Sequence, residues 1–224
     1  MLSADEAIKT RRSVRAFTQQ PVERATIEEI LDVAQRAPSG TNTQPWQVHV
    51  FTGEARDELC GAVLDAFWNE PEKHAHDRLH YMDDWRDPYL ARRRKVGWDM
   101  YGLMKIERGE KEKMREAHAR NFKFFDAPVG MIFTIDNDMG WMSWLDYGMF
   151  LQNICVAARA RGLHTCAQAA WATYHTVIEN HLGLEPPQLV HCGLSLGYED
   201  TSVPVNELET VREPRENFVT FHGG

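Results

Sequence analysis

Residues 141–168 read WMSWLDYGMFLQNICVAARARGLHTCAQ and hold the most informative pattern in the chain. From 141 to 161, apolar side chains occupy nearly every helical face, which is typical of a buried helix. Gly162 follows directly and suits a helix C-cap. Residues 163–168 then form a short, strand-like segment. We therefore expect a long buried helix followed at once by a strand.

Helical and extended patterns alternate on both sides of this segment. Ser3 with Glu6 predicts a capping box for a short helix to about Lys9, and Thr26 with Glu29 predicts another for a helix that ends near residue 37. Further helices are expected at residues 55–68 and 175–182, and strands at residues 46–52, 128–135 and 189–198. This interleaving around a buried helix favours an α+β or α/β fold with one mixed sheet.

A polar, aromatic-rich segment interrupts the pattern at about residues 69–122. Between residues 86 and 123, twelve Lys and Arg stand against six Asp and Glu, whereas the whole chain has a formal charge of −8. The segment lacks the periodic strands of a second core. We therefore expect a single domain, residues 1–224, that carries a helical insertion.

The composition excludes several classes of protein. Lys and Arg total 25 against 33 Asp and Glu, so a general binder of nucleic acid or of anionic membranes is not expected. No run of about 18 apolar residues predicts a membrane span, and the acidic N-terminus does not resemble a signal peptide. The four cysteines form no C-x-x-C pair, which predicts reduced, buried thiols in a cytoplasmic protein.

Three separate clusters are rich in hydrogen-bonding side chains. Residues 11–15 read RRSVR, and guanidinium groups beside a hydroxyl suit a phosphate. Residues 37–46 read APSGTNTQPW; the prolines predict a turn, and Gly40 permits close approach of the backbone to a ligand. The third is Arg212 with Pro214 in the C-terminal tail, after Pro204, Val205 and Asn206. Each cluster alone is also consistent with a solvated surface or a capped connection.

Together, these clusters resemble the flavin-dependent nitroreductase family over essentially the whole chain, as do GL at 162–163, TCAQ at 165–168 and GY at 197–198. The RRSVR and APSG forms are also similar to the iodotyrosine deiodinase branch of that superfamily. The resemblance implies an α+β, three-layer fold with helices around a mixed, mostly antiparallel sheet. It also implies an intertwined homodimer with two FMN molecules at its interface, and a lid over the flavin formed by residues 69–122.

The resemblance also assigns site residues, position by position. Those expected from one subunit are Arg11, Ser13 and Arg212 at the FMN phosphate, Arg12 at the phosphate or ribityl chain, Arg15 near flavin N1 and O2, and backbone amides near Gln168 and Ala169 at N5 and O4. Those expected to line the isoalloxazine are Pro38, Ser39, Gly40 and Asn42 of the partner subunit. A contact from Arg120, Asn121 or Lys123 stays open. Since the flavin carries the hydride chemistry, no catalytic side chain and no metal are assigned.

The expected function is reduction of nitroaromatic compounds by an FMN-dependent oxidoreductase, with NAD(P)H as electron donor and a ping-pong cycle. The basic insertion favours acceptors with a carboxylate, such as a nitrobenzoate. The alternatives are reductive dehalogenation of halophenols and FMN binding or storage without turnover. Residues 193–197 also fit the hydrolase pattern G-x-S-x-G, but the strand pattern continues through them. His74, His76 and His80 could bind a metal, but a solvated helix is favoured.

Overall fold

The computed structural model describes residues 2–74 and 84–223, and their core is a four-stranded antiparallel sheet. The strand order is β1-β2-β4-β3, so β2 and β4 lie at the centre. The strands are β1 (Gln47–Thr52), β2 (Val129–Asp136), β3 (His164–Gln168) and β4 (Gln188–Gly197). Ser13 adds a parallel bridge to Thr165 at the outer edge of β3. The prediction of a mostly antiparallel sheet is therefore confirmed: the four strands pair only antiparallel, and this parallel bridge lies outside them.

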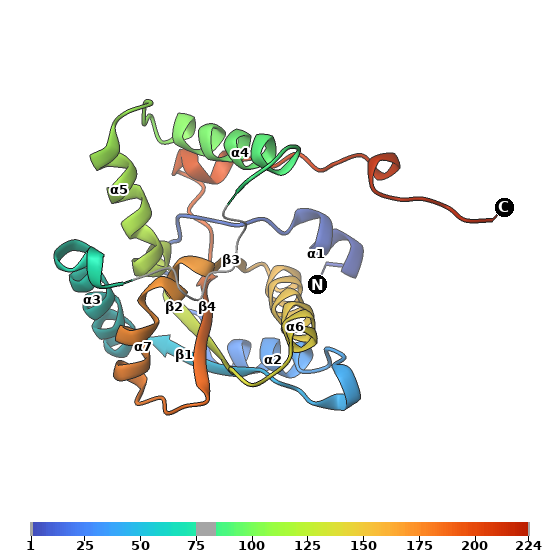
Figure 1. The fold of residues 1–224 in the computed structure, drawn as a ribbon, viewed down its shortest axis with the longest axis horizontal. Helices are drawn as coiled ribbons and strands as arrows, with labels where there is room; N and C mark the ends of the chain where they lie inside the picture. Colours follow the sequence, from blue (N-terminus) through green and yellow to red (C-terminus); the bar gives the residue numbers. More distant parts are fainter. Residues whose placement is uncertain (1, 75–83, 224) are drawn as a thin grey trace.

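Helices cover both faces of the sheet (Figure 1). They are α1 (Ala4–Thr10), α2 (Arg24–Ala34), α3 (Gly53–Asn69), α4 (Tyr89–Leu103), α5 (Lys111–Ala119), α6 (Trp141–Ala160) and α7 (His175–Leu182). Along β2, Met131 and Phe133 pack with α2 and α6, whereas Ile132 packs with α3 and α7. This period of two separates the core into two layers around the sheet and confirms the three-layer α+β fold.

The predicted helix ends are confirmed at two positions and wrong at a third. Ser3 and Glu6 form the capping box of α1, and Gly183 ends α7 with a left-handed φ of 63°. Thr26 and Glu29 do not form the second box, because α2 begins at Arg24 with Glu23 as its N-cap. Thr26 therefore lies inside the first turn of α2, which an ion pair between Arg24 and Glu28 spans at 2.7 Å.

Two glycines of the central strands allow aromatic rings to lie directly on the sheet. A Cβ atom at Gly193 would lie 2.3 Å from Trp171 Cδ1, and one at Gly130 would lie 2.3 Å from Phe124 Cε2. The Phe124 and Trp171 rings also stack, with centroids 4.2 Å apart. These contacts fix two short 3₁₀ segments, η3 (Arg120–Asp126) and η4 (Ala169–Tyr174), which border the site described below.

The C-terminal segment runs beside α4 and then leaves the body of the protein (Figure 1). Arg92 Nη2 of α4 lies 2.6 Å from Glu213 Oε2, which joins the two. Farther along, Phe218 and Phe221 are 69% and 79% exposed. Helices α4 and α5 fall in the predicted insertion, and α4 has no buried residue. Among residues 2–74 and 84–223, no helix has the length and apolarity that a membrane crossing requires.

Candidate functional site

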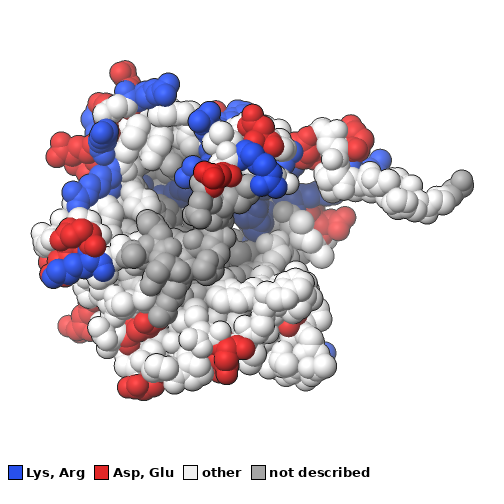
Figure 2. All heavy atoms as spheres, viewed as in Figure 1, with Lys and Arg blue, Asp and Glu red and all other residues white. Residues whose placement is uncertain are grey.

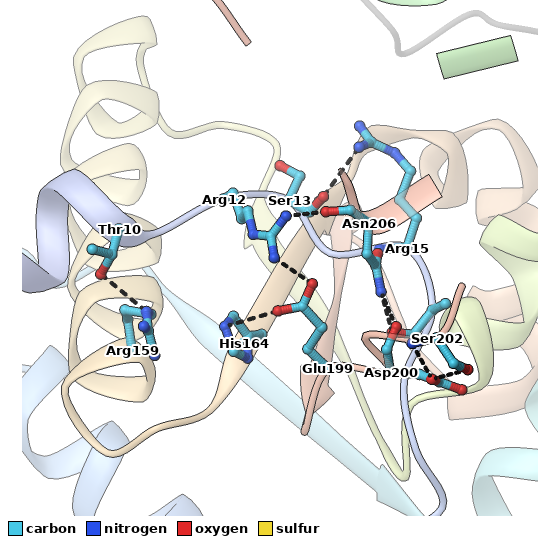
Figure 3. Close-up of polar contacts among 11 residues, drawn as sticks. Thr10, Arg12, Ser13, Arg15, Arg159, His164, Glu199, Asp200, Ser202 and Asn206 are labelled. Carbon is cyan, nitrogen blue, oxygen red and sulfur yellow. Dashed lines mark hydrogen bonds and ion pairs between the residues drawn. The ribbon is translucent and has the colours of Figure 1, made fainter. Parts of the chain in front are cut away.

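The RRSVR segment runs extended along the outer edge of β3 (Figure 3). The Val14 amide donates a hydrogen bond to the Thr165 carbonyl at 3.1 Å. Val14 and Ala16 are buried at 0% and 3% exposure, whereas Ser13 is exposed. Because side chains of an extended chain alternate, Arg11, Ser13 and Arg15 lie on the opposite side from Arg12, Val14 and Ala16.

Two neighbouring cavities bring three predicted phosphate residues together. Ser13 and Arg212 line a cavity of about 500 Å³, which is roofed by side chains of α4. Arg11 and Arg212 line the adjoining cavity of about 870 Å³. Arg212 donates to Thr210 Oγ1 at 2.7 Å, a neutral acceptor. Figure 2 shows Lys and Arg side chains in the recess between α4 and the body of the protein, which favours an anionic ligand there.

The backbone of β3 presents an open edge beside these residues. Since the Thr165 carbonyl accepts from Val14, the backbone N–H and C=O of Thr165 point away from β4. Alternation then points the Ala169 amide toward the open edge and the Gln168 amide toward its partner Gly193. Of the two amides predicted at the flavin, that of Ala169 is therefore the one directed outward.

Gln168 contributes a buried side chain, which bridges the centre of the sheet and η3. Its Nε2 donates to the Asn121 carbonyl at 2.8 Å, and its Oε1 accepts from the Ser195 hydroxyl at 2.7 Å. Ser195 is fully buried within β4, so residues 193–197 do not form the exposed turn that a hydrolase requires.

Arg15 faces a third cavity, of about 220 Å³. Arg120 and Asn121 also line it, whereas Lys123 does not. Of the three residues for which the sequence left an FMN contact open, Arg120 and Asn121 are therefore the two that border this cavity. The Arg15 guanidinium donates to the Ser13 carbonyl at 3.1 Å, and Arg120 pairs with Asp126 at 2.9 Å. Met100 of α4 and Met104, the C-cap of that helix, also line this cavity; their spacing gave no sequence signal for it.

The loop of residues 38–42 lies apart from these cavities, none of which it lines. Gly40 donates its amide to Asp146 of α6, and the Gln44 amide donates to Ser39 Oγ at 3.0 Å. Thr41 and Asn42 have positive φ angles of 50° and 61°, which fix a tight turn. The structure therefore does not bring Pro38, Ser39, Gly40 and Asn42 to the Arg11 cluster of the same chain.

Arg12 is held by residues that sequence reasoning missed. Its guanidinium pairs with Glu199 at 2.5 Å and donates to the Asn206 carbonyl (Figure 3). His164 Nε2 lies 3.4 Å from the other Glu199 oxygen, and burial lowers the pKa of His164. Arg12 also borders the cavity of Arg11. Its contact with FMN stays a prediction, and its guanidinium has other partners in this structure.

The four thiols supply no further reactive group. All four cysteines are free and buried, as expected, and burial raises the pKa of Cys166 to about 11 and of Cys60 to about 12. In the described part of the chain, no group of three His, Cys, Asp or Glu residues could hold a metal ion. His76 and His80 lie outside the described residues.

Comparisons with known proteins identify the family to which this chain belongs. Residues 8–198 match the model of the Nitroreductase family. A 4-nitrobenzoate reductase of Pseudomonas putida is 43% identical over 98% of this chain and 95% of its own length, and a nitrobenzene nitroreductase of Ectopseudomonas oleovorans is 39% identical over 97% and 96%. The crystal structure of an FMN and NADPH-dependent nitroreductase, NfnB from Sphigopyxis sp. strain HMH, superposes with a TM-score of 0.96, at 36% identity over 100% of both chains. The chain belongs to the nitroreductase family.

Proposed function

We propose that this chain is an FMN-dependent oxidoreductase that uses NAD(P)H to reduce nitroaromatic compounds. The observation that carries the proposal is that Arg11, Ser13 and Arg15 each line a cavity, and that Arg212 lines the cavities of Arg11 and Ser13. Guanidinium and hydroxyl donors in this arrangement fit a phosphate ester. The FMN and NADPH dependence of the Sphigopyxis relative supports the same cofactors here.

The residues present fit both the phosphate and the flavin ring of FMN. Arg11, Ser13 and Arg212 would hold the phosphate, and Arg15 would place its charge near N1 and O2 of the flavin. The outward amide of Ala169 would donate to the N5 and O4 edge. When bound, FMN supplies the hydride chemistry, so the chain binds and orients the reactants. The nicotinamide donor and the nitro acceptor would occupy one site in turn, in a ping-pong cycle.

A homodimer would complete the site, because the loop of residues 38–42 and the Arg11 cluster lie apart in one chain. The loop of residues 38–42 of the partner subunit would then cover the flavin. In support, the first turns of α6 expose Trp141 (80%), Met142 (48%) and Leu145 (56%), and the C-terminal arm exposes Phe218 and Phe221. A second copy would bury these apolar surfaces. Leu145→Asp should yield monomers that lose FMN, as sedimentation velocity can show; a flavin-bound monomer would argue against a shared site.

The acceptor we favour is an aromatic nitro compound with a carboxylate, such as 4-nitrobenzoate. Of the four basic residues 92–95, Arg92 pairs with Glu213 and Lys95 pairs with Asp99 at 2.7 Å. Arg93 borders the 500 Å³ cavity with its guanidinium 5.1 Å from the Trp85 ring centroid. A stacked guanidinium keeps donors for a carboxylate. The activity of the Pseudomonas putida relative is in line with this choice.

Substrate kinetics test the choice of acceptor. We expect Arg93→Gln to lower kcat/KM for 4-nitrobenzoate by about tenfold and to leave nitrobenzene within about twofold. Arg94→Gln is the matched control, since Arg94 is exposed on the same helix and does not line the cavity. The preference for the carboxylate should also decrease with added salt. Equal losses for both acceptors would remove Arg93 from carboxylate recognition.

The same assays separate the alternatives. A halophenol dehalogenase would release halide from a halophenol and NAD(P)H, and a storage protein would bind FMN without oxidising NAD(P)H. We expect nitro-dependent oxidation of NAD(P)H. The cytoplasmic location and the single domain at residues 1–224 stay predictions.

A further inference from the structure

The Arg12 side chain is 39% exposed and borders the 870 Å³ cavity, but its guanidinium is held by two acceptors from distant parts of the chain. Glu199, two residues after β4, approaches Arg12 Nη2 with its Oε1 at 2.5 Å, and its side chain is 7% exposed. The Asn206 carbonyl accepts from Arg12 Nη1. A nearly buried carboxylate requires a positive partner, because its desolvation is costly. Arg12 Nη2 lies closer to the Glu199 carboxylate than His164 Nε2 does, at 2.5 Å against 3.4 Å, so Arg12 is the cation that pairs with Glu199.

Asn206 holds the residues that follow Arg12. It is 4% exposed, and its Oδ1 accepts from the Arg15 amide at 2.8 Å. Its Nδ2 donates to the carbonyls of Ala16 at 2.8 Å and Asp200 at 2.9 Å. The two ends of the Asn206 amide group therefore join residues 15–16 to the segment that follows β4 (Figure 3).

These contacts fix which side chains of the RRSVR segment face the cavities. A shift by one residue would turn the buried Val14 outward, and Ser13 and Arg15 inward. Such a shift would separate Arg12 from Glu199 and the Arg15 amide from Asn206, and would leave buried polar groups without partners. The bonds to Glu199 and Asn206 thus hold the segment against this shift in register. The hydrogen bond from Val14 to Thr165 holds it as well, at the edge of β3.

We propose that Arg12, Glu199 and Asn206 form a positioning clamp, which sets the register of residues 11–16 so that Arg11, Ser13 and Arg15 face the cofactor, and that Arg12 acts through this clamp rather than as a phosphate ligand. The inference rests on the proposed function, because FMN is the ligand whose binding reports the register. It assigns a role in cofactor binding to two residues, Glu199 and Asn206, to which the sequence analysis gave no role.

The direction in which Glu199→Gln changes the Kd of FMN distinguishes the clamp from direct phosphate binding by Arg12. Glu199→Gln removes a negative charge close to the site of a dianion, so electrostatics alone would tighten FMN binding or leave it unchanged. The clamp requires the opposite: the Kd of FMN should rise about tenfold. Glu207→Gln is the matched control, because Glu207 is an exposed carboxylate next to Asn206. It should stay within about twofold of the wild-type Kd.

A double-mutant cycle tests whether Arg12 and Glu199 act as one unit. Arg12→Gln should weaken FMN binding about tenfold, and the double variant with Glu199→Gln should bind no more than about tenfold weaker than wild type. An Arg12 that binds the phosphate directly would give independent effects and leave Glu199→Gln at or below the wild-type Kd. That result would overturn the clamp.

The reduction potential of bound FMN distinguishes positioning from a general loss of stability. With FMN at saturation, Asn206→Ala should shift the potential to more negative values, because the Arg15 backbone is released from its anchor. A merely structural role would leave the potential of the bound flavin at its wild-type value, and that outcome would also overturn the proposal. If Asn206→Ala does not fold, the Glu199→Gln and Arg12→Gln titrations carry the test. A wild-type full chain that binds no FMN would refute the proposed function itself.

Discussion

Gly40 donates its backbone N–H to Oδ2 of Asp146 at 3.0 Å, and this bond ties the loop of residues 38–42 to helix α6. Asp146 is 6% exposed, so the bond forms in a largely dry environment. The same helix carries the exposed apolar residues proposed to face a second chain. Asp146 therefore connects the proposed dimer surface with the loop proposed to cover the flavin.

Loss of the Asp146 carboxylate should loosen this loop. We expect Asp146→Ala to raise the Kd of FMN by about fivefold to tenfold, since the Gly40 amide loses its acceptor. Asp146→Asn should stay close to wild type, because its amide oxygen can still accept. Fluorescence titration of FMN would measure both. If Asp146→Ala binds FMN like wild type, the loop does not depend on this bond or does not contact the flavin.

Arg212 is proposed to pair with the phosphate, and charge-assisted bonds of this kind contribute about 1.5–3 kcal/mol. Arg212→Ala should therefore weaken FMN binding at least about tenfold, while riboflavin, which lacks the phosphate, changes much less. Arg215→Ala is the control from the same exposed segment. An equal loss of affinity for FMN and riboflavin would place Arg212 away from the phosphate.

Arg15 is proposed to stabilise the anionic reduced flavin with its charge. Arg15→Gln should retain FMN but give it a lower reduction potential and slower reduction by NAD(P)H. Potentiometry of the FMN-loaded variant would measure this. An unchanged potential would limit Arg15 to a structural or phosphate-side role.

His191 should make the stability of the protein depend on pH. Its ring packs edge-on against Trp144 and Tyr147, at centroid distances of 4.7 and 5.0 Å, and burial lowers its pKa from 6.5 to about 4. The folded state keeps His191 neutral, whereas the unfolded state takes up a proton below about pH 6.5. This contribution to the free energy of unfolding is therefore full above about pH 6.5 and is lost as the pH falls toward about 4.

Urea unfolding of wild type and His191→Phe at several pH values would isolate this effect, since Phe keeps the ring contacts without a titrating group. We expect the wild type to lose more stability than the variant between about pH 7 and about pH 4.5. Parallel losses in the two proteins would show that His191 does not carry the dependence.

Sequence patterns predicted the elements whose signals are local. The apolar run of residues 141–161 corresponds to α6, and the glycine after residues 175–182 caps α7 in the left-handed region. The ends of α4 could not be predicted, because none of its residues is buried and its hydrophobic periodicity is weak. For Thr26, a motif match was misleading, since α2 begins two residues earlier at Arg24.

The candidate site was predictable where a motif carries it and not where contacts between distant segments do. Arg11 and Ser13 each line a cavity that Arg212 also lines, and their contact with the FMN phosphate stays a prediction from the family resemblance. Arg12 and Glu199, by contrast, lie 187 positions apart and approach because Phe17 and Glu199 form a bridge. No local pattern encodes that pairing, and the letters RRSVR do not show which arginine faces inward.

The central claim, that this chain passes electrons from a nicotinamide to a nitroarene through FMN, can be tested directly under anaerobic conditions. The FMN-loaded full chain is mixed with NADPH or NADH in a stopped-flow instrument, and 4-nitrobenzoate is added afterwards. The account predicts that the nicotinamide bleaches the absorbance of the oxidised flavin and that the nitro compound restores it. A flavin that neither nicotinamide reduces, or that stays reduced in the presence of 4-nitrobenzoate and nitrobenzene, would contradict it.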